Sequence, residues 1–386
     1  MTTWGLRTFA VAGLLAVSCG SIHGVATAPG TASAGRTTPA SSARLQSPCP
    51  VVQPTPQFPA SAPSSRNLAL VTLRGSNNII VRDITDIAHP TTVNTLGTIQ
   101  QPQFVSATVL TYIDHQEGVD QENLVRVPLV ESPAISVARG CQGISAFAWS
   151  PDGSTVVYVT PTNSRADVHQ LSSTGDRVIG SMPSGGVGGC ETYESCTLPN
   201  WMDFQLHFSP DGTLISLVIK TFSGTVFRIW SADGKSLEMD DSYGATMSAW
   251  SGKALYLRDA KGVSVWRNES ISTFLAGVAW IRPSASPGGG MIVYSVRDSA
   301  GWAHTYVVDT ATARARELNK ARTSAVFLTS RYIWYEGERD CQPEDHCGAS
   351  PAIHPLSGKT YIYDLQDGTE TESIITGVAD VWPHPA

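Results

Sequence analysis

Seven cysteines carry the most reactive side chains of this chain. The number is odd, so at least one cysteine is left over when the others pair. If Cys19 has a separate role, six remain, and four of these form two pairs that are close in sequence. Disulfides of this kind persist in exported proteins. The expected pairs are Cys49 with Cys141, Cys190 with Cys196, and Cys341 with Cys347.

Cys341 and Cys347, together with His346, could alternatively bind zinc. A structural zinc site needs four ligands, and the sequence shows no second cluster of cysteine or histidine that would complete it. A disulfide is therefore the preferred interpretation. We predict that the protein has no metal site and no cofactor.

The sequence contains no motif that is typical of catalysis. A Gly-x-Ser-x-Gly elbow, a His-Glu-x-x-His helix, a Walker-type loop and an EF-hand loop are all absent. The glycine-rich run 185–189 lacks the lysine and the following helix of a phosphate-binding loop. We interpret the scattered histidines as ordinary strand or loop residues and predict a protein without catalytic residues. These histidines are His115, His169, His207, His304 and His354.

The N-terminus has the pattern of an export signal. Arg7 precedes a short apolar run, 9–17, which is too short to be a transmembrane helix. The following residues, 16–19, resemble a bacterial lipobox. That resemblance implies a signal peptide at 1–18, a lipid on Cys19, and a protein anchored to the outer side of the bacterial cell membrane. The alternative is cleavage after residues 26–28, which would give a secreted protein.

Composition narrows the choice of partners. The segment 19–65 is rich in Ser, Thr, Ala and Pro and is expected to be a tether. The formal net charge is −7, and the low content of lysine and arginine argues against nucleic acid as a partner. Beyond the N-terminus no stretch is long enough to span a membrane. Contact with a membrane is therefore expected only through the lipid anchor.

The elements that position these residues are short repeated strands. The two clearest copies, 147–153 and 206–212, each end in Ser-Pro-Asp-Gly and are followed by a second apolar run. Proline, aspartate and glycine together predict a tight turn between antiparallel strands. A third and a fourth strand complete each unit, and long periodic helical segments are absent. Weaker copies are at 103–105, 248–252, 278–280, 325–327 and 381–383.

Seven such units are predicted to form a closed ring. A small sheet cannot bury both of its faces alone, but sheets arranged radially bury their faces against one another. The first unit, with strands at 68–72, 78–82 and 92–96, lacks an innermost strand, and the C-terminal residues 378–382 supply one. The aromatic residues of the repeats are expected in the core between blades. They are Trp149, Phe208, Trp250 and Trp280.

The sequence Trp-Ser-Pro-Asp-Gly before an apolar strand resembles the TolB-like propeller repeat, a relative of the WD-type repeat, over about residues 66–386. The resemblance implies an all-β, seven-bladed β-propeller of four-stranded antiparallel blades, which the C-terminal strand closes. Such propellers are usually protein-binding modules, but they also occur as domains of peptidases and other enzymes. The fold therefore does not decide the function.

Three connections are predicted to be long and to lie on the same face of the ring: 114–122, 183–201 and 336–357. Binding sites usually lie in loops on a rigid scaffold. We therefore predict a non-catalytic binding module for an envelope protein or peptide. The alternative is an enzyme or carbohydrate-binding propeller with its site in the central channel. The candidate binding face comprises Asp114, Glu117, Asp120, Tyr193, Trp201, Glu336, Glu338, Asp340, Glu344 and Asp345.

Overall fold

The computed structural model describes residues 66–115, 122–129, 135–140, 144–161, 165–183, 204–221, 224–240, 245, 247–340 and 356–384. The predicted signal peptide and tether, 1–65, lie outside these residues, as do all seven cysteines. So do Glu117, Asp120, Tyr193, Trp201, Glu344 and Asp345. Among the residues that are described, no helix is long and apolar enough to cross a membrane.

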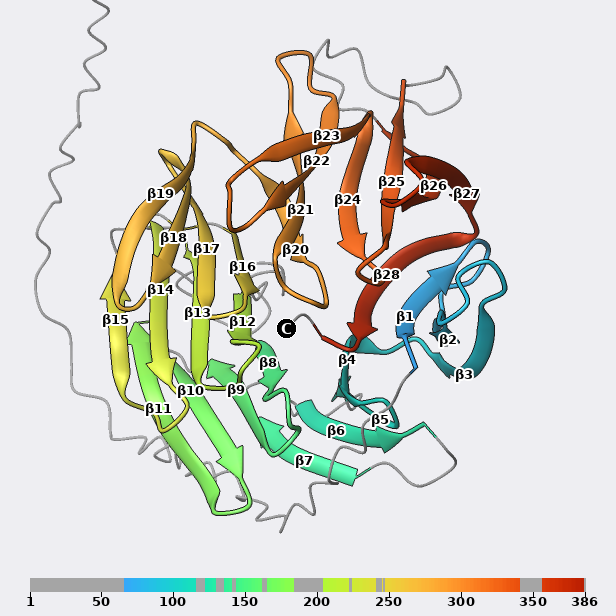
Figure 1. Ribbon diagram of the computed structural model, residues 1–386. Coiled ribbons are helices and arrows are strands. Elements are labelled where there is room, and N and C mark those ends of the chain that lie inside the picture. Colours follow the sequence, from blue (N-terminus) through green and yellow to red (C-terminus); the bar gives the residue numbers. More distant parts are fainter. Residues whose placement is uncertain are drawn as a thin grey trace, which may run out of the picture. The chain divides into compact units, whose positions relative to one another are not determined.

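The strands form seven four-stranded antiparallel sheets, arranged as the blades of a ring (Figure 1). Blade one contains β28 (Ile375–Trp382), β1 (Leu68–Leu73), β2 (Ile79–Asp83) and β3 (Thr91–Gly97). Blade two contains β4 (Gln100–Ser106), β5 (Val109–His115), β6 (Glu122–Pro128) and β7 (Ile135–Gly140). Blade three contains β8 (Ala146–Trp149), β9 (Thr155–Pro161), β10 (Arg165–Ser172) and β11 (Gly175–Pro183). Blade four contains β12 (Phe204–Phe208), β13 (Leu214–Thr221), β14 (Gly224–Ser231) and β15 (Ser236–Asp240).

The remaining three blades have the same order from the centre outwards. Blade five contains β16 (Met247–Ser251), β17 (Ala254–Asp259), β18 (Gly262–Arg267) and β19 (Ser270–Ala276). Blade six contains β20 (Ile281–Ala285), β21 (Met291–Arg297), β22 (Ala303–Asp309) and β23 (Ala315–Lys320). Blade seven contains β24 (Arg322–Phe327), β25 (Tyr332–Arg339), β26 (Leu356–Asp364) and β27 (Thr369–Ser373). The predicted seven-bladed propeller is confirmed.

The Ser-Pro-Asp-Gly turns form for the predicted reason. In blade three, Ser150 Oγ donates to Asp152 Oδ1 over 2.6 Å, and the same oxygen accepts from the backbone N–H of Ser154. Gly153 has φ of +67°, which a residue with a side chain rarely adopts. Blade four repeats the pattern with Ser209 and Asp211, whose oxygens are 2.7 Å apart. Each aspartate thus accepts hydrogen bonds from residues of its own turn.

The C-terminal strand closes the ring, as predicted. β28 pairs antiparallel with β1, with Leu68 opposite Trp382 and Leu73 opposite Ile375. The strand is longer than the predicted 378–382 and ends beside the centre of the ring in Figure 1. Asp380 Oδ2 also accepts a hydrogen bond of 2.6 Å from the backbone N–H of Phe104 in blade two. The chain end therefore joins blades one and two.

The core lies between the blades. The described apolar side chains form seven clusters, one for each pair of neighbouring blades. The four predicted core aromatics, Trp149, Phe208, Trp250 and Trp280, are all buried. Because the blades bury only one another, each interface needs a large side chain from the repeat, which explains why aromatic residues recur at this position.

One repeat was placed wrongly by the sequence. The predicted inner strand of blade six at 278–280 lies before the actual strand, β20 (Ile281–Ala285). Trp280 precedes β20 and packs with Tyr256 and Tyr294 in the core between blades five and six. The turn after β20 begins at Ser286, whose Oγ bonds to the backbone oxygen of Gly289. This turn lacks the aspartate of the clear copies. The strand was therefore predicted from the position of Trp280, which lies before it.

Candidate functional site

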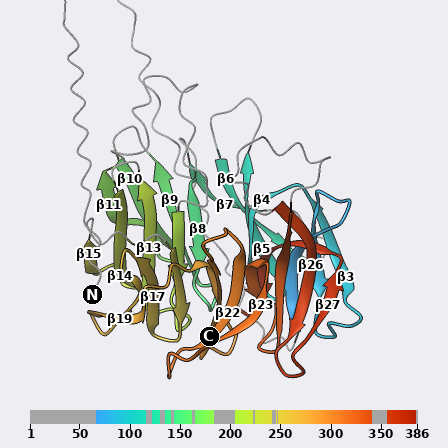
Figure 2. The ribbon, with the colours of Figure 1, turned by 90° about the horizontal axis from the view of Figure 1, so that it is seen from above.

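The ring has two faces, which lie at opposite ends of the strands (Figure 2). The turn face carries the connections between first and second strands, such as 150–154 and 209–213. The loop face carries the connections between second and third strands and between successive blades. The segments 116–121, 184–203 and 340–355 all leave the strands at the loop face, because every blade is antiparallel.

The strands reach further towards the loop face than the sequence suggested. β5 and β6 continue to His115 and from Glu122, which leaves only 116–121 between them. β25 continues to Arg339 and pairs there with β26 at Leu356, so residues 336–339 belong to a strand. The strand ends are polar, so the apolar pattern of the sequence did not indicate them. Backbone hydrogen bonds between strands hold them, rather than apolar side chains.

Three predicted binding residues of the loop face are accessible to different degrees. Asp114 and Glu336 are half-buried near the ends of their strands, and Asp340 is exposed directly after β25. Burial, together with the nearby Asp114 carboxylate, raises the pKa of Tyr112. These residues supply negative charge at the rim of the loop face.

Glu338 has an internal role instead. Its side chain is 2% exposed, and its Oε1 forms an ion pair of 2.9 Å with Arg297 Nη2. Its Oε2 accepts a hydrogen bond of 2.7 Å from the backbone N–H of Ala303. Both partners belong to blade six, so Glu338 fastens blade seven to its neighbour and presents little surface to a partner.

A small titratable group gathers near the centre of the ring. His384 Nε2 lies 3.1 Å from Asp380 Oδ2, and the His384 ring meets Trp382 edge-on at 5.2 Å between centroids. His207, on the inner strand β12, interacts electrostatically with both Asp380 and His384. Sequence reasoning treated His207 as an ordinary strand residue and did not single out His384. Only ring closure brings residues so far apart in sequence together.

The two histidines are perturbed in opposite directions. Burial lowers the pKa of His384, but the Asp380 carboxylate and its hydrogen bond outweigh burial and raise it. Enclosure by the ring lowers the pKa of His207 to about 4, and His384 acts in the same direction against Asp380. Solvent reaches the exposed His207 side chain and moderates this effect, but the neutral form is favoured. Within the described part of the chain, no group of three or more His, Cys, Asp or Glu side chains is placed to hold a metal ion.

Other polar residues of the inner strands join neighbouring blades. Gln103 Nε2 donates to the backbone oxygen of Phe147 over 3.1 Å. Gln205 Oε1 accepts from the backbone N–H of Ser248 over 2.7 Å. Arg282 Nη1 donates to Ser324 Oγ over 2.8 Å. These groups stabilise the closed ring, which limits what they can offer a ligand.

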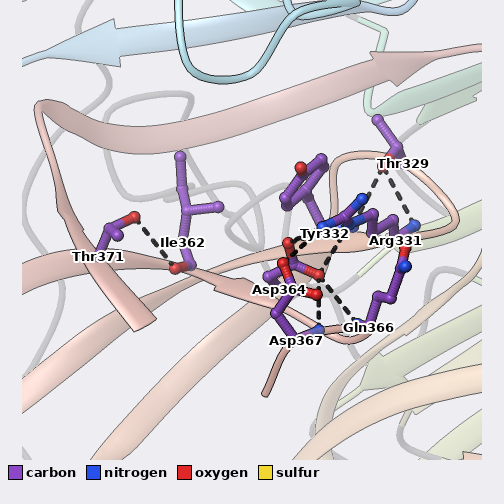
Figure 3. A network of polar contacts seen from close by, with 8 residues as sticks. All are labelled: Thr329, Arg331, Tyr332, Ile362, Asp364, Gln366, Asp367 and Thr371. Atoms are coloured by element: carbon purple, nitrogen blue, oxygen red, sulfur yellow. Dashed lines mark hydrogen bonds and ion pairs between the residues drawn. The ribbon is translucent and has the colours of Figure 1, made fainter. Parts of the chain in front are cut away.

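The turn face of blade seven is built around an arginine network (Figure 3). Arg331 Nε donates to both carboxylate oxygens of Asp364 at 2.8 and 2.9 Å, and its Nη2 contacts Asp364 and Asp367 at 2.5 and 2.8 Å. The guanidinium also lies 5.2 Å from the ring centroid of Tyr332. Hydrogen bonding by Arg331 holds the pKa of Asp364 well below its usual range. The network ties the inner turn of the blade to its outer turn.

Comparison with known proteins identifies the architecture only. No protein-family model matches the chain, and no curated protein matches it either. A solved oligogalacturonate lyase in complex with manganese is similar, with a TM-score of 0.52 and 9% identity over 82% of this chain and 86% of that one. At this identity the likeness shows the fold alone.

Two further solved structures are less similar. TolB from Acinetobacter baumannii has a TM-score of 0.45 and 14% identity over 82% of this chain, which spans 65% of the length of TolB. The propeller domain of the Trilobed protease from Pyrococcus furiosus has a TM-score of 0.49 and 10% identity over 72% of this chain and 83% of that one. The similar structures thus include both TolB and enzymes.

Proposed function

We propose that this chain is a non-catalytic binding module that holds a protein or peptide partner on its loop face. The observation that carries the proposal is topological: the segments 184–203 and 340–355, the longest between strands, both leave the ring at that face. On a rigid scaffold, long connections are the usual place for recognition.

The chemistry of the two faces supports this choice. On the turn face, the carboxylates of Asp152 and Asp211 are taken up by their own turns. On the loop face, Asp114, Glu336 and Asp340 lie at strand ends beside segments that add further acidic residues in sequence. A partner with a basic surface fits this distribution. Rim charges of this kind act mainly on the association rate and its salt dependence.

We further propose that the module acts outside a bacterial membrane, anchored through a lipid on Cys19. The lipobox-like residues 16–19 and the acid-free segment 19–65 support this placement. The test is to replace Cys19 by serine and to fractionate the cells. The protein should move from the membrane fraction to the soluble one; membrane retention of the variant would contradict the anchor.

The binding proposal is tested by neutralising the loop face. The four changes Glu336→Gln, Asp340→Asn, Glu344→Gln and Asp345→Asn leave Glu338 and its ion pair in place. Surface changes of this kind alter stability by only ~0.5 kcal/mol. Crosslinking in membranes followed by mass spectrometry should recover less of the native partner, and the loss should be larger at low salt. Glu269→Gln, an exposed change of the same chemistry on the turn face, is the control for position.

Equal partner recovery by the four-fold variant and the wild-type protein would exclude the loop face as the binding surface. Loss of recovery with Glu269→Gln alone would place binding on the turn face. Thermal melting of both variants shows whether either change also alters the fold.

A second candidate function is an enzyme or carbohydrate-binding propeller with its site at the centre of the ring. The observation in its favour is the meeting of His207, Asp380 and His384 there. If this group holds a ligand, then replacing His207 by alanine should abolish ligand-dependent stabilisation in a thermal screen of oligosaccharides, while partner recovery from membranes stays unchanged.

A further inference from the structure

The turn face has a groove between blades six and seven, with a volume of about 430 Å³. Its floor is the open end of the core between these blades: Val307 belongs to that core, and Met291 and Leu365 pack against it. Ser330 and Gln366 lie at its side. We call this hollow the six–seven groove. Its size falls within the range of small binding sites.

The rim of the six–seven groove is basic. Arg316 lies directly opposite Val307 in the pairing of β22 with β23, and Arg314 is the residue before β23. Both line the groove. Both are exposed, and neither guanidinium forms a hydrogen bond or ion pair with another residue of the described ranges.

The other charged groups at the groove are already engaged. Arg331 is bound by Asp364 and Asp367. Asp309 Oδ1 accepts hydrogen bonds from the backbone N–H groups of Ala311 and Thr312 in its own turn. The cations left to act on a ligand are therefore Arg314 and Arg316. They stand out on a chain whose formal net charge is −7.

The equivalent place between blades three and four shows why Arg316 is left over. There Arg177 lies opposite Gln170 in the sheet, as Arg316 lies opposite Val307. Arg177 Nη2 donates to Gln170 Oε1 over 2.6 Å, and Gln170 Nε2 donates to the backbone oxygen of Ala232 in blade four over 2.7 Å. Val307 has no oxygen that could accept such a bond. Arg316, which lies opposite Val307, therefore has no side-chain acceptor at this position.

We propose that the six–seven groove is a docking site for an acidic segment of a partner protein, in which one apolar side chain lies between carboxylates. The apolar side chain covers Met291, Val307 and Leu365, and the carboxylates pair with Arg314 and Arg316. Arginine forms bidentate bonds with carboxylates, which fixes the orientation of such a segment. An apolar centre with a charged rim is also the usual anatomy of an interface.

The charge of the chain itself argues for a separate partner. The N-terminal segment 1–65 contains no aspartate or glutamate, so it cannot supply the carboxylates. The site lies on the opposite face from the binding surface proposed above and does not depend on it. The two surfaces differ in sign, since the loop face is acidic.

The test uses fluorescence anisotropy with the full-length protein and a fluorescein-labelled heptapeptide of alternating glutamate and leucine. Replacing both Arg314 and Arg316 by glutamate should weaken peptide binding by about tenfold, because two attractive pairs become repulsive. Val307→Gln, which recreates the arrangement of blade three, should weaken binding without changing the net charge. Arg267→Glu, on the turn face of blade five, is the charge control matched to the single variant Arg316→Glu, and it should leave binding unchanged.

Control peptides distinguish the contribution of the apolar side chains of the peptide to binding from that of its carboxylates. A peptide with serine in place of leucine should bind more weakly, and one with lysine in place of glutamate should not bind. The proposal is overturned if the serine peptide binds as well as the leucine peptide, or if the double arginine variant binds like the wild-type protein. It is also overturned if sedimentation shows wild-type self-association that the double variant loses, since the occupant would then be a second copy. Thermal melting of each variant confirms that it is folded.

Discussion

The interface between blades three and four and the interface between blades six and seven start from one plan and end differently at the turn face. In the first, Gln170 holds Arg177 and bridges to Ala232 of the next blade. In the second, Val307 occupies the place of Gln170, and Arg316 stays exposed beside an open groove. Both interfaces have a hollow at the turn face, with a volume of about 320 Å³ between blades three and four and about 430 Å³ between blades six and seven. Gln170 bridges the first, whereas the second keeps a basic rim.

The inner turns of these blades differ in the same sense. Blades three and four have Ser-Pro-Asp-Gly, and their aspartates bond within the turn. Blade six has no aspartate in this turn, and in blade seven Thr329 Oγ1 accepts from the backbone N–H of Tyr332 over 3.1 Å. The acid of blade seven is Asp364, in the outer turn, where it binds Arg331 (Figure 3). The clear repeats thus bind an aspartate within the inner turn, whereas the inner turn of blade seven binds an aspartate of its outer turn.

The largest expected effect comes from opening the ring, on which both interfaces depend. Deleting residues 378–386 removes most of β28, the Asp380 bond to Phe104, and buried Val381. Loss of a large buried side chain costs about 3–5 kcal/mol, and here several contacts are lost together. Urea denaturation followed by tryptophan fluorescence should show a large drop in the free energy of unfolding. A truncated protein whose free energy of unfolding equals that of the intact one would disprove closure by β28.

A smaller effect should separate the two interfaces directly. Phe208 is 9% exposed in the core between blades three and four, and its change to alanine should cost about 3–5 kcal/mol. Leu365 is only half-buried at the floor of the six–seven groove, so Leu365→Ala should cost clearly less than Phe208→Ala. The measurement is the free energy of unfolding of both variants under identical conditions. Equal costs would show that Leu365 is as tightly packed as Phe208.

Exchanging the residue types at positions 170 and 307 should change the free energy of unfolding still less. Gln170→Val removes the acceptor of Arg177 and the donor to Ala232, which should cost about 1–2 kcal/mol. Val307→Gln gives Arg316 an acceptor and should be close to neutral, since lost apolar contact offsets the new bond. Chemical denaturation of the two single variants and the double variant tests this. A stability loss from Val307→Gln that exceeds the loss from Gln170→Val would contradict the assigned equivalence.

The sequence predicted the ring but not the sites within it. The Ser-Pro-Asp-Gly copies and the leftover strand near Trp382 indicated seven blades and their closure, because both depend on local turn chemistry and apolar pattern. The role of Glu338 could not be predicted, since its partners Arg297 and Ala303 come from another blade. The first strand of blade six was predicted too early in the sequence, because Trp280 resembles the aromatic residue of the repeat although no Ser-Pro-Asp-Gly turn follows it.

Predicting the six–seven groove requires the strand register as well as the apolar pattern of the sequence. Only the pairing of Val307 with Arg316 and of Gln170 with Arg177 shows that these positions correspond. The sequence contains all four residues, but the outer turns of the two blades differ, so spacing alone does not align them. Side-chain contacts between distant strands are set by the closed ring, and local sequence carries no direct record of them.

The smallest expected effect concerns pH and involves the centre of the ring, which belongs to neither interface. The folded-state pKa of His384 is raised above 6.5 by Asp380, so its stabilising contribution is present below pH 6.5 and is lost as pH rises through the folded pKa. The folded-state pKa of His207 is lowered below 6.5, so its contribution is present above pH 6.5 and is lost as pH falls through the folded pKa. His384→Gln should therefore flatten the fall in melting temperature on the alkaline side, and His207→Gln should flatten it on the acid side. Melting temperatures measured from the acid to the alkaline side of pH 6.5 give both slopes. Because the His384 charge also lowers the pKa of His207, His384→Gln should additionally make the acid loss of stability smaller and bring it to an end at a higher pH. Two variants that flatten the same side of the profile would show that the pKa values of the two histidines are not shifted in opposite directions.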